Sequence, residues 1–397
     1  MFTRVASKAC RILPIVLILG LILATQPTAV VSAVEAGIPN NPQSTLSTTA
    51  ADHLVTEIVL TPHTPNVLEF NQNVNLSFNY QTSEPGGVRI FARPFSNGAL
   101  TPNYAAHGSG VYPGGSGSGT GFFTITSGAV TVDQIRIQML NADQTVLLFE
   151  AFIPVHYQFR DPAHIITEIA LTPPNPNVLE FNQNLNLSFN YKTSQPGGVR
   201  IFARPFTNGA LTPNYAAHGS GLYPSGSGSG TGFFTITSGE VTVDHIRIQM
   251  VNADQTLLLF ETFIPVHYQF KDPTQLVYEI VLNPPAPNIL DHNQNVNLSF
   301  KYKTSEPGGV RIFARPFTAG APSPNYAAHG SGLYPGGSGS GTGFFTISSG
   351  PVIVDHIRIQ MVNADQTLLL FETLIPVHYQ YGKVYRLYMP VIHKAGS

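Results

Sequence analysis

The chain has 397 residues, with 20 basic and 22 acidic side chains and a formal net charge of −2 at pH 7. This balance excludes binding driven by nucleic acid phosphates or by an anionic membrane, because both need an excess of Lys and Arg. Hydrophobic residues make up 43% of the chain and charged residues 11%, so the chain can bury substantial cores and is not of the disordered class.

Residues 1–33 have the organisation of a secretory signal peptide. Basic residues precede an apolar stretch from Ile12 to Ala24, and Val31-Ser32-Ala33 fits a small-residue cleavage site. The apolar stretch is shorter than the roughly 20 residues of a membrane-spanning helix. We expect cleavage after Ala33 to remove Cys10, the single cysteine, so that the secreted chain has no disulfide and no cysteine nucleophile.

A long internal repeat organises the rest of the chain. Each position recurs 111 residues further on, which brings Arg89, Arg200 and Arg311 into register. The period is the size of a domain rather than of a solenoid repeat. We therefore expect three domains, at residues 53–162, 163–273 and 274–383.

The segments outside the repeats are short. Residues 34–52 are polar and lack periodicity, so we expect a flexible spacer, and residues 384–397 form a C-terminal tail. Only a few residues, including Asp161-Pro162 and Asp272-Pro273, separate one repeat from the next. Linkers this short and stiffened by proline favour a semi-rigid rod of three domains placed end to end.

Each repeat reads as β-structure throughout. Apolar and polar residues alternate from Asn73 to Gln81, which is typical of a strand with one solvated face. In the longest expected strand, the odd positions from Leu147 to Phe159 are all apolar and are predicted to face the core. Pro154 cannot donate a ladder hydrogen bond and indicates an edge or a bulge there. The strands expected in the first repeat are Thr56–Leu60, Asn73–Gln81, Gly87–Phe95, Gly119–Thr126, Asp133–Leu140 and Thr145–Phe159.

Six or seven strands in about 105 residues, without a helical pattern, predict a two-sheet antiparallel sandwich. In strand count and spacing, residues 53–383 resemble the tandem immunoglobulin-like or fibronectin-like sandwiches of secreted bacterial surface proteins. The resemblance implies an all-β chain of three tandem antiparallel β-sandwich domains. The Cys…Trp…Cys spacing of immunoglobulin domains is absent. The segment Tyr388–Lys394 is similar to a short tail of some bacterial secreted proteins, and an extra edge strand is the alternative.

Motifs for catalysis or cofactor binding are absent from the sequence. The run from Gly114 to Gly121 leads into a strand rather than a helix, so we expect a flexible loop and not a phosphate-binding loop. The histidines lack metal-ligand spacing, and no two carboxylates are placed as a catalytic pair. We expect no cofactor, no metal and no enzymatic activity.

One constellation is a candidate ligand site. Arg89, Phe91, Arg93 and Phe95 alternate with core positions, and Arg136 and Glu150 lie on strands expected to be neighbours. Either the loop 96–118 folds back over this face, with Arg89 or Arg93 bonding its carbonyls or pairing with Glu150, or the face is open to a ligand. The candidate ligand-binding residues are Arg89, Arg93, Tyr104, His107, Tyr112, Arg136 and Glu150, with their copies Arg200, Arg204, Tyr215, His218, Tyr223, Arg247, Glu261, Arg311, Arg315, Tyr326, His329, Tyr334, Arg358 and Glu372.

These patterns favour a secreted, non-enzymatic repeat protein that acts as an extracellular adhesive or spacer rod. A cell-surface glycan or protein is the expected partner. The alternative is a carbohydrate-binding protein with one site per repeat, which uses loop aromatics such as Tyr104 and Tyr112.

Overall fold

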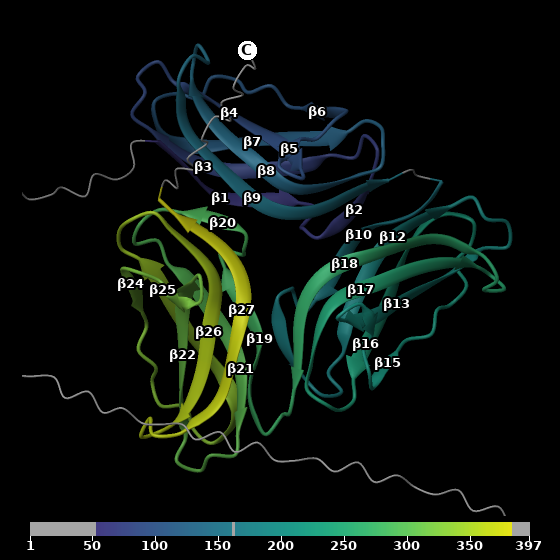
Figure 1. The fold of residues 1–397 in the computed structure, drawn as a ribbon, viewed down its shortest axis with the longest axis vertical. Helices are drawn as coiled ribbons and strands as arrows, with labels where there is room; N and C mark the ends of the chain where they lie inside the picture. Colours follow the sequence, from purple (N-terminus) through teal and green to yellow (C-terminus); the bar gives the residue numbers. More distant parts are fainter. Residues whose placement is uncertain (1–52, 161–162, 383–397) are drawn as a thin grey trace, which may run out of the picture. The chain divides into compact units, whose positions relative to one another are not determined.

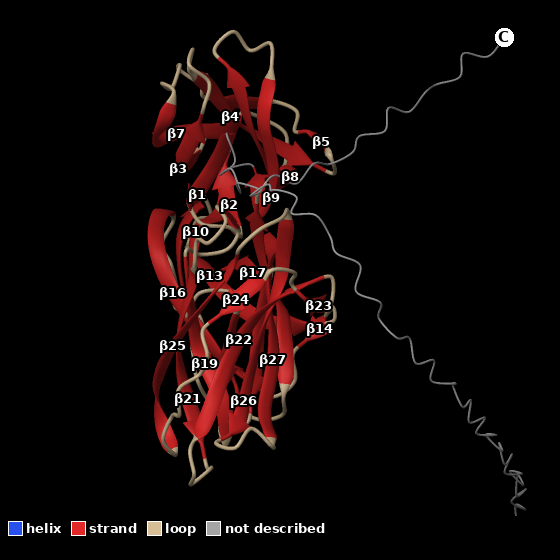
Figure 2. Cartoon of the chain, turned by 90° about the vertical axis from the view of Figure 1, so that its left-hand side faces the viewer, coloured by secondary structure: helices blue, strands red, loops and turns tan. Residues whose placement is uncertain are grey.

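The computed structural model describes residues 53–160 and 163–382, and over these residues every helix or strand element is a strand. The expected signal peptide, spacer and C-terminal tail lie outside the described residues. Figure 1 colours the strands by their position in the sequence, and Figure 2 shows strands connected by loops. The all-β prediction is confirmed, with three repeated pairs of sheets, one pair in each of three sandwiches.

Each sandwich contains nine strands. Sandwich 1 comprises β1 (His53–Thr61), β2 (Asn66–Glu69), β3 (Val74–Thr82), β4 (Val88–Ser96), β5 (Ala99–Leu100), β6 (Tyr104–Ala106), β7 (Gly115–Ile125), β8 (Val130–Asn141) and β9 (Leu147–Arg160). Sandwich 2 comprises β10 (His164–Thr172), β11 (Asn177–Glu180), β12 (Leu185–Thr193), β13 (Val199–Thr207), β14 (Ala210–Leu211), β15 (Tyr215–Ala217), β16 (Gly226–Ile236), β17 (Val241–Asn252) and β18 (Leu258–Lys271). Sandwich 3 comprises β19 (Gln275–Asn283), β20 (Asn288–Leu290), β21 (Val296–Thr304), β22 (Val310–Thr318), β23 (Ala321–Pro322), β24 (Tyr326–Ala328), β25 (Gly337–Ile347), β26 (Val352–Asn363) and β27 (Leu369–Tyr381).

The strand order is that of an immunoglobulin-like sandwich. One sheet has the order β1-β3-β7-β6, and the other has the order β2-β9-β8-β4-β5. These are the ABED sheet and the GFC sheet of that fold, the latter extended at both edges. The short strand β2 runs parallel to β9, so the expectation of wholly antiparallel pairing is wrong at this one edge.

The core of each sandwich lies between its two sheets, as the alternation predicted. In β3 the apolar residues from Val74 to Tyr80 are buried, and the polar residues between them are exposed. In β9 the odd positions from Phe149 to Phe159 are buried, but Leu147 is 50% exposed because it lies at the end of the β8–β9 hairpin. Pro154 lies opposite Gln134, beside a register shift, so the bulge that this proline indicated is present.

The strand expected at Gly119–Thr126 begins earlier than predicted, because most of the glycine-rich run expected as a flexible loop is strand as well. Strand β7 begins at Gly115 and pairs with β3 from Gly115 to Phe123. A Cβ atom at Gly119 would lie 2.6 Å from the Phe78 ring and 2.8 Å from the Tyr112 ring. Glycine is present at this position because two aromatic rings approach the backbone closely.

Buried asparagines connect the sandwiches to one another. Asn66 Nδ2 donates a hydrogen bond to the Ile169 carbonyl at 3.3 Å, and the Ile169 amide donates to Asn66 Oδ1 at 3.1 Å. A bulge in β10 leaves the amide and carbonyl of Ile169 without a partner in the strand ladder. The Asn66 side-chain amide bonds to both groups, as the backbone of a neighbouring strand would. The same two bonds join Asn177 to Ile280 and Asn288 to Ile58.

These contacts form a closed cycle, because sandwich 1 binds sandwich 2, sandwich 2 binds sandwich 3, and sandwich 3 binds sandwich 1. The last contact links residues that are 230 positions apart in the sequence. An end-to-end rod would leave sandwiches 1 and 3 separated, so the predicted rod is wrong. Short linkers constrain consecutive domains but do not determine whether the first and last domains meet.

Candidate functional site

The predicted arginines of each repeat lie on the outer surface of the five-stranded sheet. In sandwich 1, Arg93 on β4 is directly opposite Arg136 on β8, which is directly opposite Phe152 on β9. We call this surface the arginine face and define it by Arg89, Arg93, Arg136 and Glu150 and their copies in sandwiches 2 and 3. The prediction that these strands are neighbours is confirmed.

Aromatic rings support two arginines of the face. The guanidinium carbon of Arg93 lies 5.0 Å from the centre of the Phe91 ring, and that of Arg136 lies 4.8 Å from the centre of the Phe95 ring. In the other two sandwiches the corresponding distances are 5.0 and 4.8 Å, and 5.2 and 4.6 Å. Stacking on a ring holds each guanidinium in a fixed plane without neutralising its charge.

One carboxylate accompanies the two opposed arginines. Glu150 accepts a hydrogen bond from Gln138 at 2.9 Å, and the equivalent glutamates of sandwiches 2 and 3 lie 4.0 Å from Arg247 and Arg358. Arg93 stacks on rings, and the predicted pairing of Arg93 with Glu150 is wrong. Since like charges directly opposite each other destabilise a strand pair, the arrangement favours an anion above the two guanidinium groups.

Arg89 has a structural role. Its Nη1 donates to the Ser109 carbonyl at 2.6 Å, and its Nε donates to the Ala142 carbonyl at 2.9 Å. The Ser109 hydroxyl in turn accepts from the Ile90 amide at 2.8 Å. The prediction that an arginine of this face bonds a carbonyl of the loop 96–118 is therefore confirmed for Arg89. The same two bonds recur at Arg200 and Arg311.

The three predicted loop aromatics do not gather at one place. Tyr104 lies on β6, and its ring centre is 5.7 Å from the Arg93 guanidinium. Tyr112 packs against the core residues Phe78 and Tyr80, and its hydroxyl donates to the Thr120 carbonyl at 3.2 Å. Burial raises the pKa of its copies Tyr223 and Tyr334.

His107 lies on the other sheet. Its ring centre is 5.5 Å from that of Phe122 on β7, and its backbone amide donates to the Phe122 carbonyl. It is therefore not at the rim of the arginine face. The copies Tyr215, Tyr223, His218, Tyr334 and His329 follow the same pattern, whereas the Tyr326 hydroxyl accepts a hydrogen bond from Arg315 at 2.9 Å.

Sequence reasoning missed a groove on the outer surface of the four-stranded sheet. It has a volume of about 450 Å³ in sandwich 1 and about 320 and 350 Å³ at the equivalent places in sandwiches 2 and 3. We call it the histidine groove and define it by Asn75, Ser77, His107, Thr120 and Phe122 and their copies. The sequence contained one signal for it, because the adjacent residues Phe122 and Phe123 of a strand must point to opposite faces.

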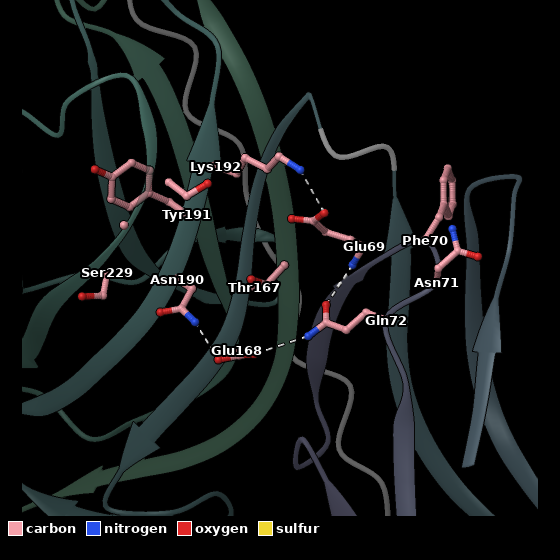
Figure 3. A pocket seen from close by; sticks show the side chains of 12 residues that line it. Glu69, Phe70, Asn71, Gln72, Thr167, Glu168, Asn190, Tyr191, Lys192 and Ser229 are labelled. Carbon is pink, nitrogen blue, oxygen red and sulfur yellow. Dashed lines mark hydrogen bonds and ion pairs between the residues drawn. The ribbon is translucent and has the colours of Figure 1, made fainter.

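A second hollow, of about 740 Å³, lies between β2 of sandwich 1 and β12 of sandwich 2. Figure 3 shows that polar contacts occupy its side chains: Lys192 with Glu69 at 3.2 Å, Gln72 with Glu168 at 3.5 Å, and Asn190 with Glu168 at 2.6 Å. The carboxylates of Glu69 and Glu168 are thus already bonded. This hollow is therefore a part of the contact between two sandwiches and does not offer an unpaired carboxylate to a ligand.

Among residues 53–160 and 163–382, no three His, Cys, Asp or Glu side chains are grouped as metal ligands would be. Over the same residues, no helix has the length and apolar character needed to cross a membrane.

The chain is a repeat protein of three immunoglobulin-like β-sandwiches. No family model matches it, and no curated protein matches it. Among solved structures it is similar to Escherichia coli alpha-2-macroglobulin activated by porcine elastase, with a TM-score of 0.20 and 12% identity, over 83% of this chain and 35% of that chain. The chain thus spans about a third of that protein's length.

It is also similar to two chains of a marsupial T cell receptor, with TM-scores of 0.18 and 0.17 and identities of 12% and 11%. Each match covers 80% of this chain and 98% of the receptor chain. No conclusion about function follows from similarity at this level. The immunoglobulin-like assignment rests on the strand order of each sandwich.

Proposed function

We propose that the protein is a secreted, non-enzymatic adhesion protein that binds an anionic extracellular polymer through its three arginine faces. The observation that carries this proposal is the recurrence, in every sandwich, of two opposed arginines stacked on phenylalanine rings with one glutamate nearby. Three equal sites on one chain favour attachment to a repetitive ligand, because binding at one site raises the effective concentration at the others.

The chemistry of the face favours carboxylate or sulfate groups as the ligand. A guanidinium group binds such groups through two parallel hydrogen bonds. The whole chain is slightly acidic, so the positive charge is local to these faces and is not a general property of the surface. A spacer, the other role considered from the sequence, needs an extended chain, which the closed cycle of contacts does not provide.

The test is surface plasmon resonance of residues 34–397 over immobilised alginate, a carboxylated polysaccharide, with neutral dextran as reference. Arg136→Gln, the double variant with Arg247→Gln, and the triple variant with Arg358→Gln remove the faces one by one. We expect each step to weaken the apparent affinity by about tenfold or more, since avidity multiplies rather than adds.

Lys271→Gln together with Lys301→Gln is the control for the double arginine variant, because each removes two positive charges and these lysines lie outside the arginine faces. This variant should bind alginate with the apparent affinity of the unmodified protein, although its net charge is more negative by two. Thermal unfolding of all variants shows whether the fold is retained. If the triple arginine variant binds as well as the unmodified protein, the arginine faces are not the binding sites.

A further inference from the structure

The histidine groove crosses three strands of its sheet and ends at His107, which follows the fourth. In the order β1-β3-β7-β6, Thr61 pairs with Asn75, and Asn75 pairs with Phe122. His107, just after β6, completes this row by stacking on the Phe122 ring. A second row, formed by Val59, Ser77 and Thr120, runs beside the first.

The polar side chains of the groove are available to a ligand. Asn75, Ser77 and Thr120 are exposed, and none of their side chains forms a hydrogen bond with the described part of the chain. The same is true of Asn186, Ser188 and Thr231 in sandwich 2 and of Asn297, Ser299 and Thr342 in sandwich 3. By contrast, Asn79, two positions after Ser77 on the same strand face, is bonded to Glu57 at 2.7 Å.

An aromatic platform lies next to these polar groups. The rings of His107 and Phe122 are inclined by 32°, and the corresponding pairs in the other sandwiches are inclined by 34° and 33°. Val59 is 42% exposed and lies on the far side of the polar side chains. In sandwiches 1 and 3 the groove therefore has apolar surface at both ends, with hydroxyl and amide groups between them, whereas in sandwich 2 Ala170 stands at the position of Val59 and does not line the groove.

We propose that the histidine groove binds a neutral oligosaccharide, with one site in each sandwich. A sugar presents an apolar face of C–H groups, which packs on an aromatic ring, and hydroxyl groups, which bond to Asn, Ser and Thr side chains. No Asp, Glu, Lys or Arg lines the groove in any of the three sandwiches, so it does not select a charged ligand. An extended peptide is disfavoured, because the groove runs over the face of a sheet whose central strands are already paired.

This site is on the opposite sheet from the arginine face and does not depend on the function proposed above. The test uses NMR of residues 34–397 with the histidine side chains labelled. Cellotetraose, maltotetraose and mannotetraose are the neutral probes, each added to about 10 mM, which fills a site with a millimolar Kd. Tetragalacturonate is the charged probe. We expect at least one neutral probe to shift the signals of His107, His218 and His329 together.

The groove is closed by the triple variant Ser77→Tyr, Ser188→Tyr and Ser299→Tyr, which should weaken binding at least tenfold. The control is the triple variant Val146→Tyr, Leu257→Tyr and Leu368→Tyr, because these residues are 50%, 53% and 54% exposed on hairpins outside the groove. The control should bind normally. The proposal is overturned if no neutral probe shifts the three histidines, if only tetragalacturonate does so, or if closing the groove leaves the shifts unchanged.

Discussion

At the contact between sandwiches 1 and 2, the side chain of Gln158 determines the protonation state of His156. Gln158 Oε1 accepts hydrogen bonds from Arg160 and from Thr262 of sandwich 2, each at 2.7 Å. Its Nε2 therefore has to be the donor, to the Phe263 carbonyl at 3.0 Å and to His156 Nε2 at 2.9 Å. A nitrogen that accepts a hydrogen bond carries no proton, so this network requires the neutral form of His156.

Burial lowers the pKa of His156 and of its copy His267 below 6.5, and the nearby His245 and His356 lower it further. Asp133 acts on the pKa of His156 in the opposite direction. The unfolded chain takes up protons at these histidines first as the pH falls. Their contribution to stability is thus complete above about pH 6.5 and is lost as the pH falls from there through the folded pKa.

We expect the urea midpoint of the protein to fall between about pH 7.5 and 5. The double variant His156→Gln and His267→Gln keeps a hydrogen-bond acceptor but cannot be protonated, so its midpoint should fall less over this range. The comparison of the two slopes isolates these histidines from the other titrating groups. Parallel slopes would show that the network does not oppose protonation.

At the scale of the strand, the sequence predicts most of the fold, because alternation and bulge signals are local. The core positions of β3 and the bulge beside Pro154 follow from neighbouring residues alone. The second half of β7 is predicted in this way, but its glycine-rich beginning at Gly115 is not. Its glycines are explained by rings that come from β3 and from Tyr112, and composition does not show such contacts.

In the candidate site too, residues on regular strands can be placed from the sequence and residues on loops cannot. The arginines of the face alternate on regular strands, so the sequence predicts that they share one sheet surface, as the strand pairing shows. His107 was grouped with them, although the path of its loop carries it to the other sheet, next to Phe122. The direction of a loop depends on tertiary contacts such as that between Arg89 and Ser109, which no periodicity encodes.

Two glycines of β7 allow a matched test of this explanation. Gly119→Ala places a methyl group against the Phe78 and Tyr112 rings and should reduce the free energy of unfolding by about 1–3 kcal/mol. Gly121→Ala meets no atom within 4 Å and should leave stability unchanged or raise it by up to about 1 kcal/mol, because alanine is less flexible in the unfolded chain. Chemical denaturation measures both. Equal effects would contradict the packing explanation.

At the scale of the whole molecule, the three contacts between sandwiches are not equal. Lys192 forms an ion pair with Glu69, and Lys303 forms one with Glu180. At the contact that closes the cycle, these positions are Gln81 and Asp291, which cannot form an ion pair. Ala151 also stands where Thr262 and Thr373 bond a glutamine of the preceding sandwich. Closure therefore depends on Asn288, on Ile289, which is buried in the core of sandwich 1, and on the bond from Gln294 to Glu57 at 2.9 Å.

Asn288→Ala should release the Ile58 amide to hydrogen exchange while the Ile169 and Ile280 amides stay protected. Loss of the buried partner should also lower the free energy of unfolding by about 1–3 kcal/mol. Asn66→Ala is the control and should release Ile169 instead. Hydrogen exchange followed by NMR distinguishes these amides. Rapid exchange at Ile58 in the unmodified protein would mean that the cycle is open in solution.

The Asn–Ile contact also has a consequence for the number of repeats, because three sandwiches satisfy every asparagine and every bulge. Near-identical tandem copies recombine readily, so copy number is expected to vary during evolution. Each contact joins two different surfaces, an asparagine turn of one sandwich and a bulge of another. A ring of such contacts closes only at a set number of sandwiches, which here is three. A chain with two or four copies would keep one exposed asparagine turn and one exposed bulge, and these would bind neighbouring chains. Closure thus penalises the gain or loss of a repeat.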